Sequence, residues 1–251
     1  MLLQPGKMPG MNPLPALPTC CTPLDDQWPL PDALPNTVLL ATHFDVSQLA
    51  SNDFQRSAIE PPPSIQRSVA KRQAEFLAGR FCARAALQRL DGLDCIPPIG
   101  EDRAPVWPMH ICGSITHSTG RAAAIVARKE HWRGLGMDLE NLLDLERAER
   151  LAGEILNPAE LQRMAAAPRE QLALWVTLTF SVKESLFKAL YPIVQKRFYF
   201  EHAEVLEWNA QGQIRLRLLT DLSSEWRNGS ELDAQFALHD GQLLSLVSIK
   251  A

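Results

Sequence analysis

Two acidic residues, two positions apart, are the first candidates for chemistry in this sequence. Asp138 and Glu140 alternate with apolar residues in Gly134–Glu140, which predicts a strand carrying both carboxylates on one face. Two neighbouring like charges are costly unless a cation or a base lies between them. Proteins hold Mg²⁺ with one or two carboxylates together with substrate phosphates and water. The pair is therefore a candidate magnesium site, and the alternative is two solvated acids at the end of a strand.

A second charged cluster lies within an apolar segment. In Phe180–Lys188 the residues Lys183, Glu184 and Lys188 interrupt a predicted helix that is apolar on several sides, which is typical of a mostly buried helix. Three charges there are costly unless they line a cleft. A carboxylate and two ammonium groups near an acidic strand would suit a phosphate and its metal. The alternative is an exposed ion pair between Glu184 and Lys188, worth about 0.3–0.5 kcal/mol.

A third group is basic. Arg80 and Arg84 lie four residues apart in a predicted helix, and Arg103 lies in a loop that contains two prolines. Guanidinium forks suit terminal phosphates, although each arginine taken singly could be an ordinary surface residue. Gly79 within the same helix costs about 1 kcal/mol relative to alanine, so we expect another element to approach closely there.

Small hydroxyl residues and one histidine end the predicted strand Gly113–Ser118. His117 is a candidate functional residue, although a single histidine is more often structural. Other enzyme motifs are excluded: the sequence has no GxxxxGK[ST], HExxH or GxSxG. Gly134-Leu135-Gly136 lacks the third glycine of a dinucleotide loop, and no P-C-x-x-C follows His202-Ala203-Glu204 as a zinc deaminase requires.

These candidates must be positioned by two similar sets of elements. The first set is a strand at Val38–Phe44, a long helix from Pro61–Ser64 to about Leu90, and strand-like segments at Val106–Met109, Ile111–Thr116 and Ala122–Ala127. The second is a strand at Gly134–Glu140, helices near Asp144–Ile155, Pro158–Ala167 and Arg169–Leu190, and strands at Phe200–Trp208, Gln213–Leu219, Asp233–His239 and Leu243–Ile249. This order predicts an α+β fold of two halves, each a small antiparallel sheet with a long helix.

Composition limits the class of protein and its compartment. The net charge of −4 excludes bulk attraction to nucleic acid or to an anionic membrane surface. Five cysteines without a CxxC pair indicate reduced thiols, and the early prolines interrupt any signal-peptide core, so we expect a cytoplasmic protein. Nine of the 19 prolines fall in the first 35 residues. Residues 1–36 are therefore predicted as an extended arm or a disordered tail, and an arm packed across the body through Trp28, Leu30 and Leu34 is the alternative.

Taken together, these segments resemble the motifs of a known family. Gly136–Glu140 and Phe180–Lys188 are similar to the two signature motifs of the 4'-phosphopantetheinyl transferases. Phe76–Arg84, Arg103–Pro108 and Gly113–Ser118 resemble additional motifs of the surfactin- and enterobactin-type members. The resemblance covers about residues 38–251 and is nearest to the broad-specificity carrier-protein synthase type.

The resemblance implies an activity and an architecture. Such enzymes transfer the 4'-phosphopantetheine arm of coenzyme A to a serine of an apo acyl or peptidyl carrier protein and release adenosine 3',5'-bisphosphate. It implies a pseudo-twofold monomer with coenzyme A in the cleft between the halves, residues 37–131 for the nucleotide and residues 132–251 for magnesium and catalysis. The carriers would serve fatty-acid, nonribosomal-peptide or siderophore assembly, with no nucleic acid or membrane as partner.

The resemblance also implies residue roles. Asp138 and Glu140 would bind Mg²⁺, with Glu184 as a third ligand or as the base. Lys183 and Lys188 would face the pyrophosphate. The nucleotide, chiefly its 3'-phosphate, would be held by Arg80, Arg84, Arg103, Thr116 and His117.

Two further points stay open at this level. Lys196–Phe200, just after the catalytic helix, is a candidate docking patch for acidic carriers, and the alternative is a loop that packs its aromatic rings inward. The rival functions are a Mg²⁺-dependent nucleotide phosphohydrolase and a non-catalytic binding module.

Overall fold

The protein is built from two antiparallel sheets, each with a long helix on one face. The computed structural model describes residues 16–251. Its strands are β1 Thr37–His43, β2 Ile111–Ser118, β3 Arg121–Arg128, β4 Trp132–Asn141, β5 Ala203–Trp208, β6 Gln213–Leu218, β7 Glu231–His239 and β8 Gln242–Lys250. Its helices are α1 Asp53–Arg56, α2 Pro63–Gln66, α3 Ala70–Asp91, α4 Leu145–Ile155, α5 Pro158–Ala165 and α6 Leu172–Val194, with 3-10 turns at Val46–Gln48, Arg169–Gln171 and Phe200–His202.

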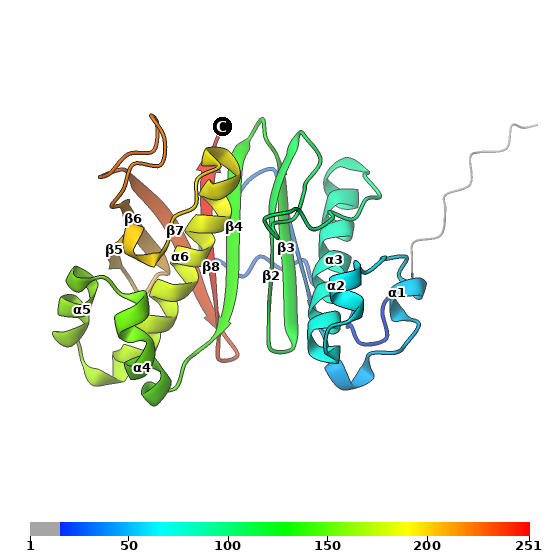
Figure 1. Ribbon diagram of the computed structural model, residues 1–251, viewed down its shortest axis with the longest axis horizontal. Helices are drawn as coiled ribbons and strands as arrows, with labels where there is room; N and C mark the ends of the chain where they lie inside the picture. The colour runs from blue at the N-terminus through cyan, green and yellow to red at the C-terminus, as the bar shows by residue number, and fades with distance from the viewer. Residues whose placement is uncertain (1–15) are drawn as a thin grey trace, which may run out of the picture.

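The sheets meet edge to edge. The first has the strand order β1-β3-β2 and the second β4-β8-β7-β6-β5. Figure 1 shows β2 and β4 side by side near the middle of the molecule, with α3 on the side of β2 and α6 on the side of β4. The predicted α+β class with two sheet-and-helix halves is confirmed.

Two predicted elements of the first half are wrong in detail. The long helix does not run unbroken from Pro61, because Val69 is extended (φ −64°, ψ 155°) and separates α2 from α3. Val106–Met109 is not a strand. Pro105 precedes it, Pro108 lies within it, and neither has the N–H group that a ladder needs. Only an isolated bridge pairs Pro105 with Ile99.

The close approach expected at Gly79 is present. A Cβ there would lie 2.9 Å from Cγ2 of Ile115, so α3 passes directly over β2. The absence of a side chain at this position allows the helix to lie against the edge strand that borders the second half.

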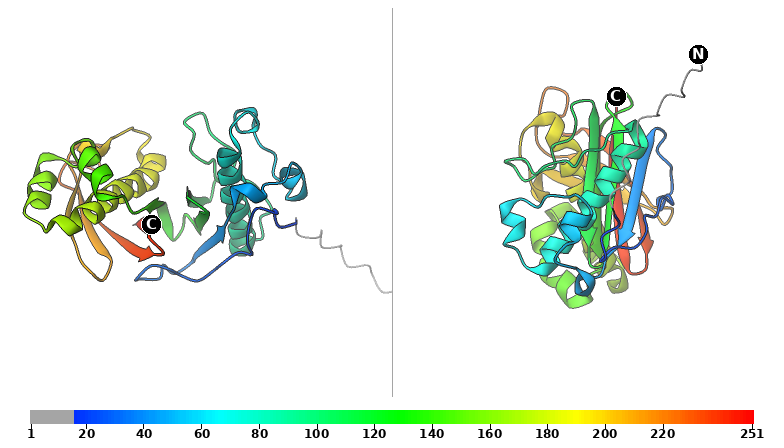
Figure 2. Two further views of the ribbon diagram at one scale, coloured as in Figure 1. Left: turned by 90° about the horizontal axis from the view of Figure 1, so that it is seen from below. Right: turned by 90° about the vertical axis from the view of Figure 1, so that its right-hand side faces the viewer.

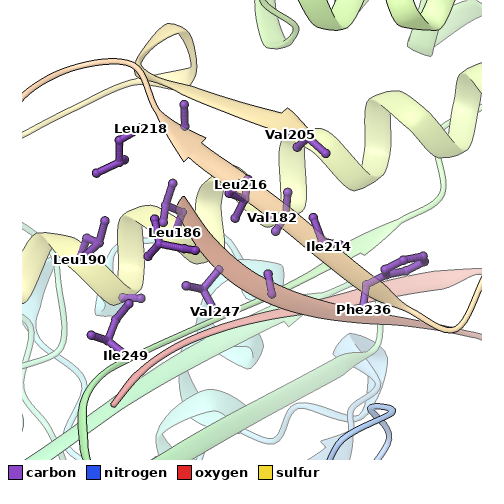
Figure 3. Close-up of a cluster of buried hydrophobic side chains, with 14 of the residues drawn as sticks. Val182, Leu186, Leu190, Val205, Ile214, Leu216, Leu218, Phe236, Val247 and Ile249 are labelled. Carbon is purple, nitrogen blue, oxygen red and sulfur yellow. The ribbon is translucent and has the colours of Figure 1, made fainter. Parts of the chain in front are cut away.

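The main core lies between α6 and the second sheet. Val182, Leu186 and Leu190 recur every four residues along α6 and are fully buried, as expected for the inner face of a helix. Figure 3 shows them directed toward apolar side chains of the sheet, which include Leu216 and Val247. This packing fixes α6, and with it the charged residues of the same helix, against the strands.

The part of the N-terminal arm that the structure describes is packed. Cys20, Cys21 and Leu30 are buried, and residues 16–36 run along the first sheet and across to the second. The alternative of an arm packed across the body therefore holds for this segment, and the prediction for residues 1–15 lies outside the described residues. All five cysteines are free. Within residues 16–251, no helix has both the length and the apolarity needed to cross a membrane.

Candidate active site

β4 lies directly against the backbone of α6 because two of its residues are glycines. A Cβ on Gly136 would lie 1.8 Å from the carbonyl oxygen of Ser185, and one on Gly134 would lie 2.4 Å from that of Ala189. No side chain fits in this space. The glycines therefore set how closely the acidic strand approaches the charged helix.

The alternation of β4 then presents its acids to α6. Asp138 pairs in register with Ser245 of β8, whose hydroxyl lies 2.8 Å from the hydroxyls of Ser181 and Ser185 on α6. Met137 points to the opposite face and is buried there. Asp138 and Glu140, two residues apart, share the face toward α6.

Lys188 binds Asp138. Its Nζ donates to Oδ1 of Asp138 at 2.6 Å and to the Met137 carbonyl at 3.1 Å. Asp138 is 5% exposed, and its Oδ2 is buried without a hydrogen-bond partner in the described part of the chain. A buried carboxylate oxygen left unpaired is costly, so this atom fits a site for a cation.

Glu140 and Glu184 complete an acidic cluster. Burial raises the pKa of Glu140 to about 7, with repulsion from Asp138 and Glu184 adding to the rise and Lys188 opposing it. The pKa of Glu184 is also raised, first by burial and further by Asp138, against the opposing charge of Lys188. The three predicted acids therefore lie close enough to influence one another's charge.

The cluster is not a preformed cage for a metal. Among residues 16–251, no three acid, imidazole or thiol groups are arranged as the ligands of one ion. Mg²⁺ commonly takes only one or two carboxylates and completes its shell with water and substrate phosphates. Together with the unpaired Asp138 oxygen, this donor set fits an ion that is bound with its phosphate substrate.

Lys183 has a structural role instead of the expected contact with pyrophosphate. The residue is 3% exposed, and its ammonium donates to Glu160 Oε2 at 2.7 Å, to the Phe200 carbonyl at 3.0 Å and to the Ile155 carbonyl at 3.1 Å. These three acceptors use all three of its donors. Glu160 is completely buried, so the ion pair joins α6 to α5 beneath the site.

A basic cluster lies on α3 and β2. Arg80 is 7% exposed with its guanidinium 4.9 Å from the Phe76 ring, and its Nε is buried without a partner among the described residues. Burial lowers the pKa of Arg80 to about 10, and the charge of Arg72 lowers it further. His117 Nε2 lies 2.9 Å from Nη1 of Arg72. Burial lowers the pKa of His117, and the charges of Lys188 and Asp138 also act on it, which places it between the basic and acidic clusters.

Arg72 is a further member of this basic cluster that was not predicted from the sequence. Its signal is weak: it precedes Arg80 by eight residues, about two helical turns, and so shares its side of α3. No motif marks it, and only its contact with His117 in the folded chain identifies it.

Two other predicted nucleotide ligands are bound elsewhere. Arg84 donates to Asp94 Oδ2 at 2.9 Å and to the Ser57 carbonyl at 2.8 Å, so its guanidinium holds the loop after α3 in place. Thr116 is buried, and its hydroxyl accepts from the Leu139 amide at 2.9 Å. Both residues are therefore assigned structural roles. Arg103 is exposed on the loop before β2, and its role stays a prediction.

The contact of Thr116 belongs to a seam between the halves. Ser114 on β2 makes the equivalent contact, since its hydroxyl accepts from the Met137 amide at 3.0 Å. β2 and β4 are thus joined through side-chain hydroxyls, and no backbone ladder is recorded between them. A pocket of about 200 Å³ lies along this junction and is lined from both halves, by Trp107 and Gly113 on one side and Lys188 on the other.

In the candidate docking segment Lys196–Phe200, some side chains pack inward and others are exposed. Phe198 is buried against Phe187, with ring centroids 5.2 Å apart. Arg197 is exposed, and Tyr199 is 61% exposed. These residues and Glu184 line a groove of about 180 Å³, so the segment borders the acidic cluster.

Comparisons with known proteins agree with this arrangement. Residues 60–127 match the family model described as the 4'-phosphopantetheinyl transferase N-terminal domain, and residues 134–244 match that of the 4'-phosphopantetheinyl transferase superfamily. Enterobactin synthase component D of Escherichia coli (strain K12) is 35% identical over 176 residues, which are 70% of this chain and 82% of that protein. The 4'-phosphopantetheinyl transferase Svp of Streptomyces mobaraensis is 34% identical over 197 residues, 76% of this chain and 78% of that protein. The 4'-phosphopantetheinyl transferase PptT of Mycobacterium tuberculosis is 36% identical over 152 residues, 58% and 63% of the two chains.

Proposed function

The chain belongs to the 4'-phosphopantetheinyl transferase superfamily and is an enzyme that transfers phosphopantetheine from coenzyme A to carrier proteins, and we propose that the cluster around Asp138 and Lys188 performs this transfer. The observation that carries the assignment is the 2.6 Å contact between Lys188 on α6 and Asp138 on β4, with Glu140 and Glu184 beside it. The acceptor would be a serine of an apo acyl or peptidyl carrier protein, and the other product adenosine 3',5'-bisphosphate.

Asp138 and Glu140 are proposed to hold Mg²⁺, with Glu184 as a third ligand or as the base. The free, buried Oδ2 of Asp138 and the mutual repulsion of the acids support this. When bound, the ion would withdraw charge from the diphosphate of coenzyme A, whose negative charge otherwise repels an attacking oxygen.

Two residues of α6 are proposed to handle protons and charge. Glu184 has a raised pKa and borders the groove, so it suits removal of the proton from the attacking serine hydroxyl. Lys188 would stabilise the negative charge that develops on the bridging oxygen as the phosphate bond breaks. Its present contact with Asp138 keeps the ammonium fixed before substrate arrives.

The N-terminal half is proposed to hold the nucleotide. Arg80 and His117 are the predicted ligands that remain on the cleft side, and Arg72 joins them through its contact with His117. The unpartnered Nε of Arg80 offers a buried donor for a phosphate oxygen. Residues 37–131 would thus bind the nucleotide, and residues 132–251 would carry the metal and the chemistry.

Carrier docking is proposed at Lys196–Phe200. Arg197 and Tyr199 are exposed there beside the groove that leads to Glu184, and an acidic carrier would meet a positive charge. Charge reversal at Lys196 and Arg197 should weaken carrier binding without changing affinity for coenzyme A, with Arg150→Glu on the exposed face of α4 as the control. Unchanged carrier binding would remove this surface from the proposal.

We further expect a cytoplasmic monomer. The relatives named enterobactin synthase component D support a role in siderophore assembly, and carriers of fatty-acid and nonribosomal-peptide synthesis are the other candidates.

The decisive experiment is mass spectrometry of an apo carrier incubated with coenzyme A and Mg²⁺. Transfer adds the mass of the phosphopantetheine arm to the carrier. Cleavage of coenzyme A with an unmodified carrier would identify a phosphohydrolase, and binding without turnover would identify a non-catalytic module. Either result would refute the assigned chemistry. A panel of apo carriers assayed side by side would then define the preferred acceptor.

A further inference from the structure

The packed arm, residues 16–36, connects the two halves on the side away from the active site. Its first part pairs with β1, through backbone hydrogen bonds between Asp25 and Ala41 and from the Thr22 amide to the His43 carbonyl. This covers the outer edge of the first sheet. Figure 2 shows the arm (dark blue) passing beneath both sheets, opposite α3 and α6.

The second part of the arm is bound to the other half. The Asp32 amide donates to Oε1 of Gln235 on β7, and Nε2 of Gln235 donates back to the Asp32 carbonyl, both at 2.9 Å. Gln235 is 7% exposed. The indole N–H of Trp132 donates to the Pro35 carbonyl at 2.9 Å. Three buried or half-buried hydrogen bonds therefore hold the arm to the second sheet.

Leu30 lies between these two parts and is 5% exposed. It belongs to one apolar cluster with Leu39 of β1 and with Leu244 and Leu246 of β8. Gln235 and Leu246 are paired in register, so they share the face of the second sheet that is opposite α6. One side chain of the arm thus belongs to an apolar cluster that is drawn from both halves.

The connection matters because the proposed ligand sites are divided between the halves. Arg72, Arg80 and His117 belong to the first half, and Asp138 and Lys188 to the second. At the seam, β2 and β4 share no backbone ladder, and their hydrogen bonds are made by side chains such as the Ser114 hydroxyl and the Cys112 thiol. Neither family model covers the arm, because the first begins at residue 60.

We propose that the arm is a strap which sets the spacing between the nucleotide-binding half and the catalytic half, with Gln235 and Leu30 as its positioning residues. The strap touches no substrate. It affects the affinity for a ligand that must contact both halves, and it has no effect on the affinity for a ligand that contacts one half alone. This rests on the proposed function for the choice of ligands.

The first test compares two ligands on Gln235→Leu, which keeps the volume and removes both hydrogen bonds to Asp32. We expect affinity for coenzyme A, which spans both halves, to fall about tenfold, the order expected for two lost hydrogen bonds. Affinity for adenosine 3',5'-bisphosphate, held by the first half, should stay within about twofold of wild type. Gln162→Leu, at an exposed position of α5, should change neither. Equal weakening of both ligands, or no weakening of coenzyme A, would overturn the proposal.

The second test needs no activity. Spin labels are placed at Lys71 on α3 and Glu146 on α4, whose side chains are 67% and 90% exposed, after Cys95→Ser. The other four cysteines are buried. Electron–electron distance measurements should give a narrow distribution that broadens in Gln235→Leu and in Leu30→Ala. An unchanged distribution in a folded variant would refute the strap. If the wild-type enzyme transferred no phosphopantetheine to a carrier, the proposed function would fail. The distance measurements would still show whether the strap sets the spacing between the halves.

Discussion

The most direct test of the site's construction is the substitution Gly136→Ala. Its Cβ would lie 1.8 Å from the Ser185 carbonyl and 2.5 Å from the Ala189 amide, whereas ordinary contact begins at 3.4 Å. The shortfall is about 1.6 Å, and both obstacles are backbone atoms of a helix, so no rotamer change relieves it. Either β4 or α6 must move by more than 1 Å.

That movement falls on the contact between Asp138 and Lys188. A hydrogen bond of 2.6 Å does not survive a displacement of more than 1 Å. Misplacement by about 1 Å can cost 10²-fold in rate, and overpacking of this kind costs about 1–3 kcal/mol of stability, or more. We expect kcat/KM for carrier modification to fall at least about 10²-fold, together with a lower Tm.

Two other glycines calibrate the effect. Gly134→Ala meets the Ala189 carbonyl at 2.4 Å, a shortfall of about 1.0 Å that lies farther from Asp138, so we expect a smaller loss, about tenfold. Gly153→Ala on the exposed side of α4 meets nothing within 4 Å, and should raise stability by about 0.5–1 kcal/mol with full activity. A Gly136→Ala enzyme with wild-type Tm and turnover within about threefold of wild type would show that the reasoning is wrong.

Three further predictions concern charged residues. Lys188→Ala, like Asp138→Ala, should lower turnover about 10²–10³-fold with a native circular dichroism spectrum, and near-normal turnover would refute the assignment. Lys183→Ala leaves Glu160 buried without its partner, so a denaturant titration should show that the free energy of unfolding falls by about 3–5 kcal/mol. Arg150→Ala, at an exposed ion pair, should lower it by less than about 1 kcal/mol. Similar losses in the two variants would contradict the structural role of Lys183. Because the folded pKa of Glu140 is raised to about 7, the metal-free protein should lose stability as pH rises from about 4.5 to 7. Mg²⁺ should therefore raise Tm more at pH 8 than at pH 5.5. An equal rise in Tm at both pH values would exclude Glu140 from the metal site.

Much of the fold is visible in the sequence because the strands of the second half alternate clearly. Ile214, Leu216 and Leu218 are buried on one face of β6, as their spacing predicts. One error, the break between α2 and α3, lies at the extended residue Val69, and the other lies in a segment that contains proline. Val106–Met109 has the apolar content of a strand, but Pro105 and Pro108 have no amide donor, and these two prolines argue against a strand in the sequence itself.

The shared face of the acids was predictable from the sequence, and the contacts of the lysines and arginines were less so. Asp138 and Glu140 follow from period two, and their approach to Lys188 follows from the glycines of the same strand. Lys183 was misassigned because its partner, Glu160, lies 23 residues away on another helix. A charged side chain in a motif gives no sign of whether it faces a cleft or a buried opposite charge, since that depends on tertiary packing.

The two halves must be held together mainly from the face opposite the site. The seam hydroxyls of Ser114 and Thr116 are neutral donors and acceptors, and their hydrogen bonds are worth about 1 kcal/mol each. On the other face, Met137 and Ile125 are completely buried in one cluster drawn from both sheets, and burial of each such side chain contributes about 1.5–3 kcal/mol. The apolar face therefore supplies most of the cohesion, and this leaves the opposite face to the charged residues of the proposed site, including the ion pair between Asp138 and Lys188.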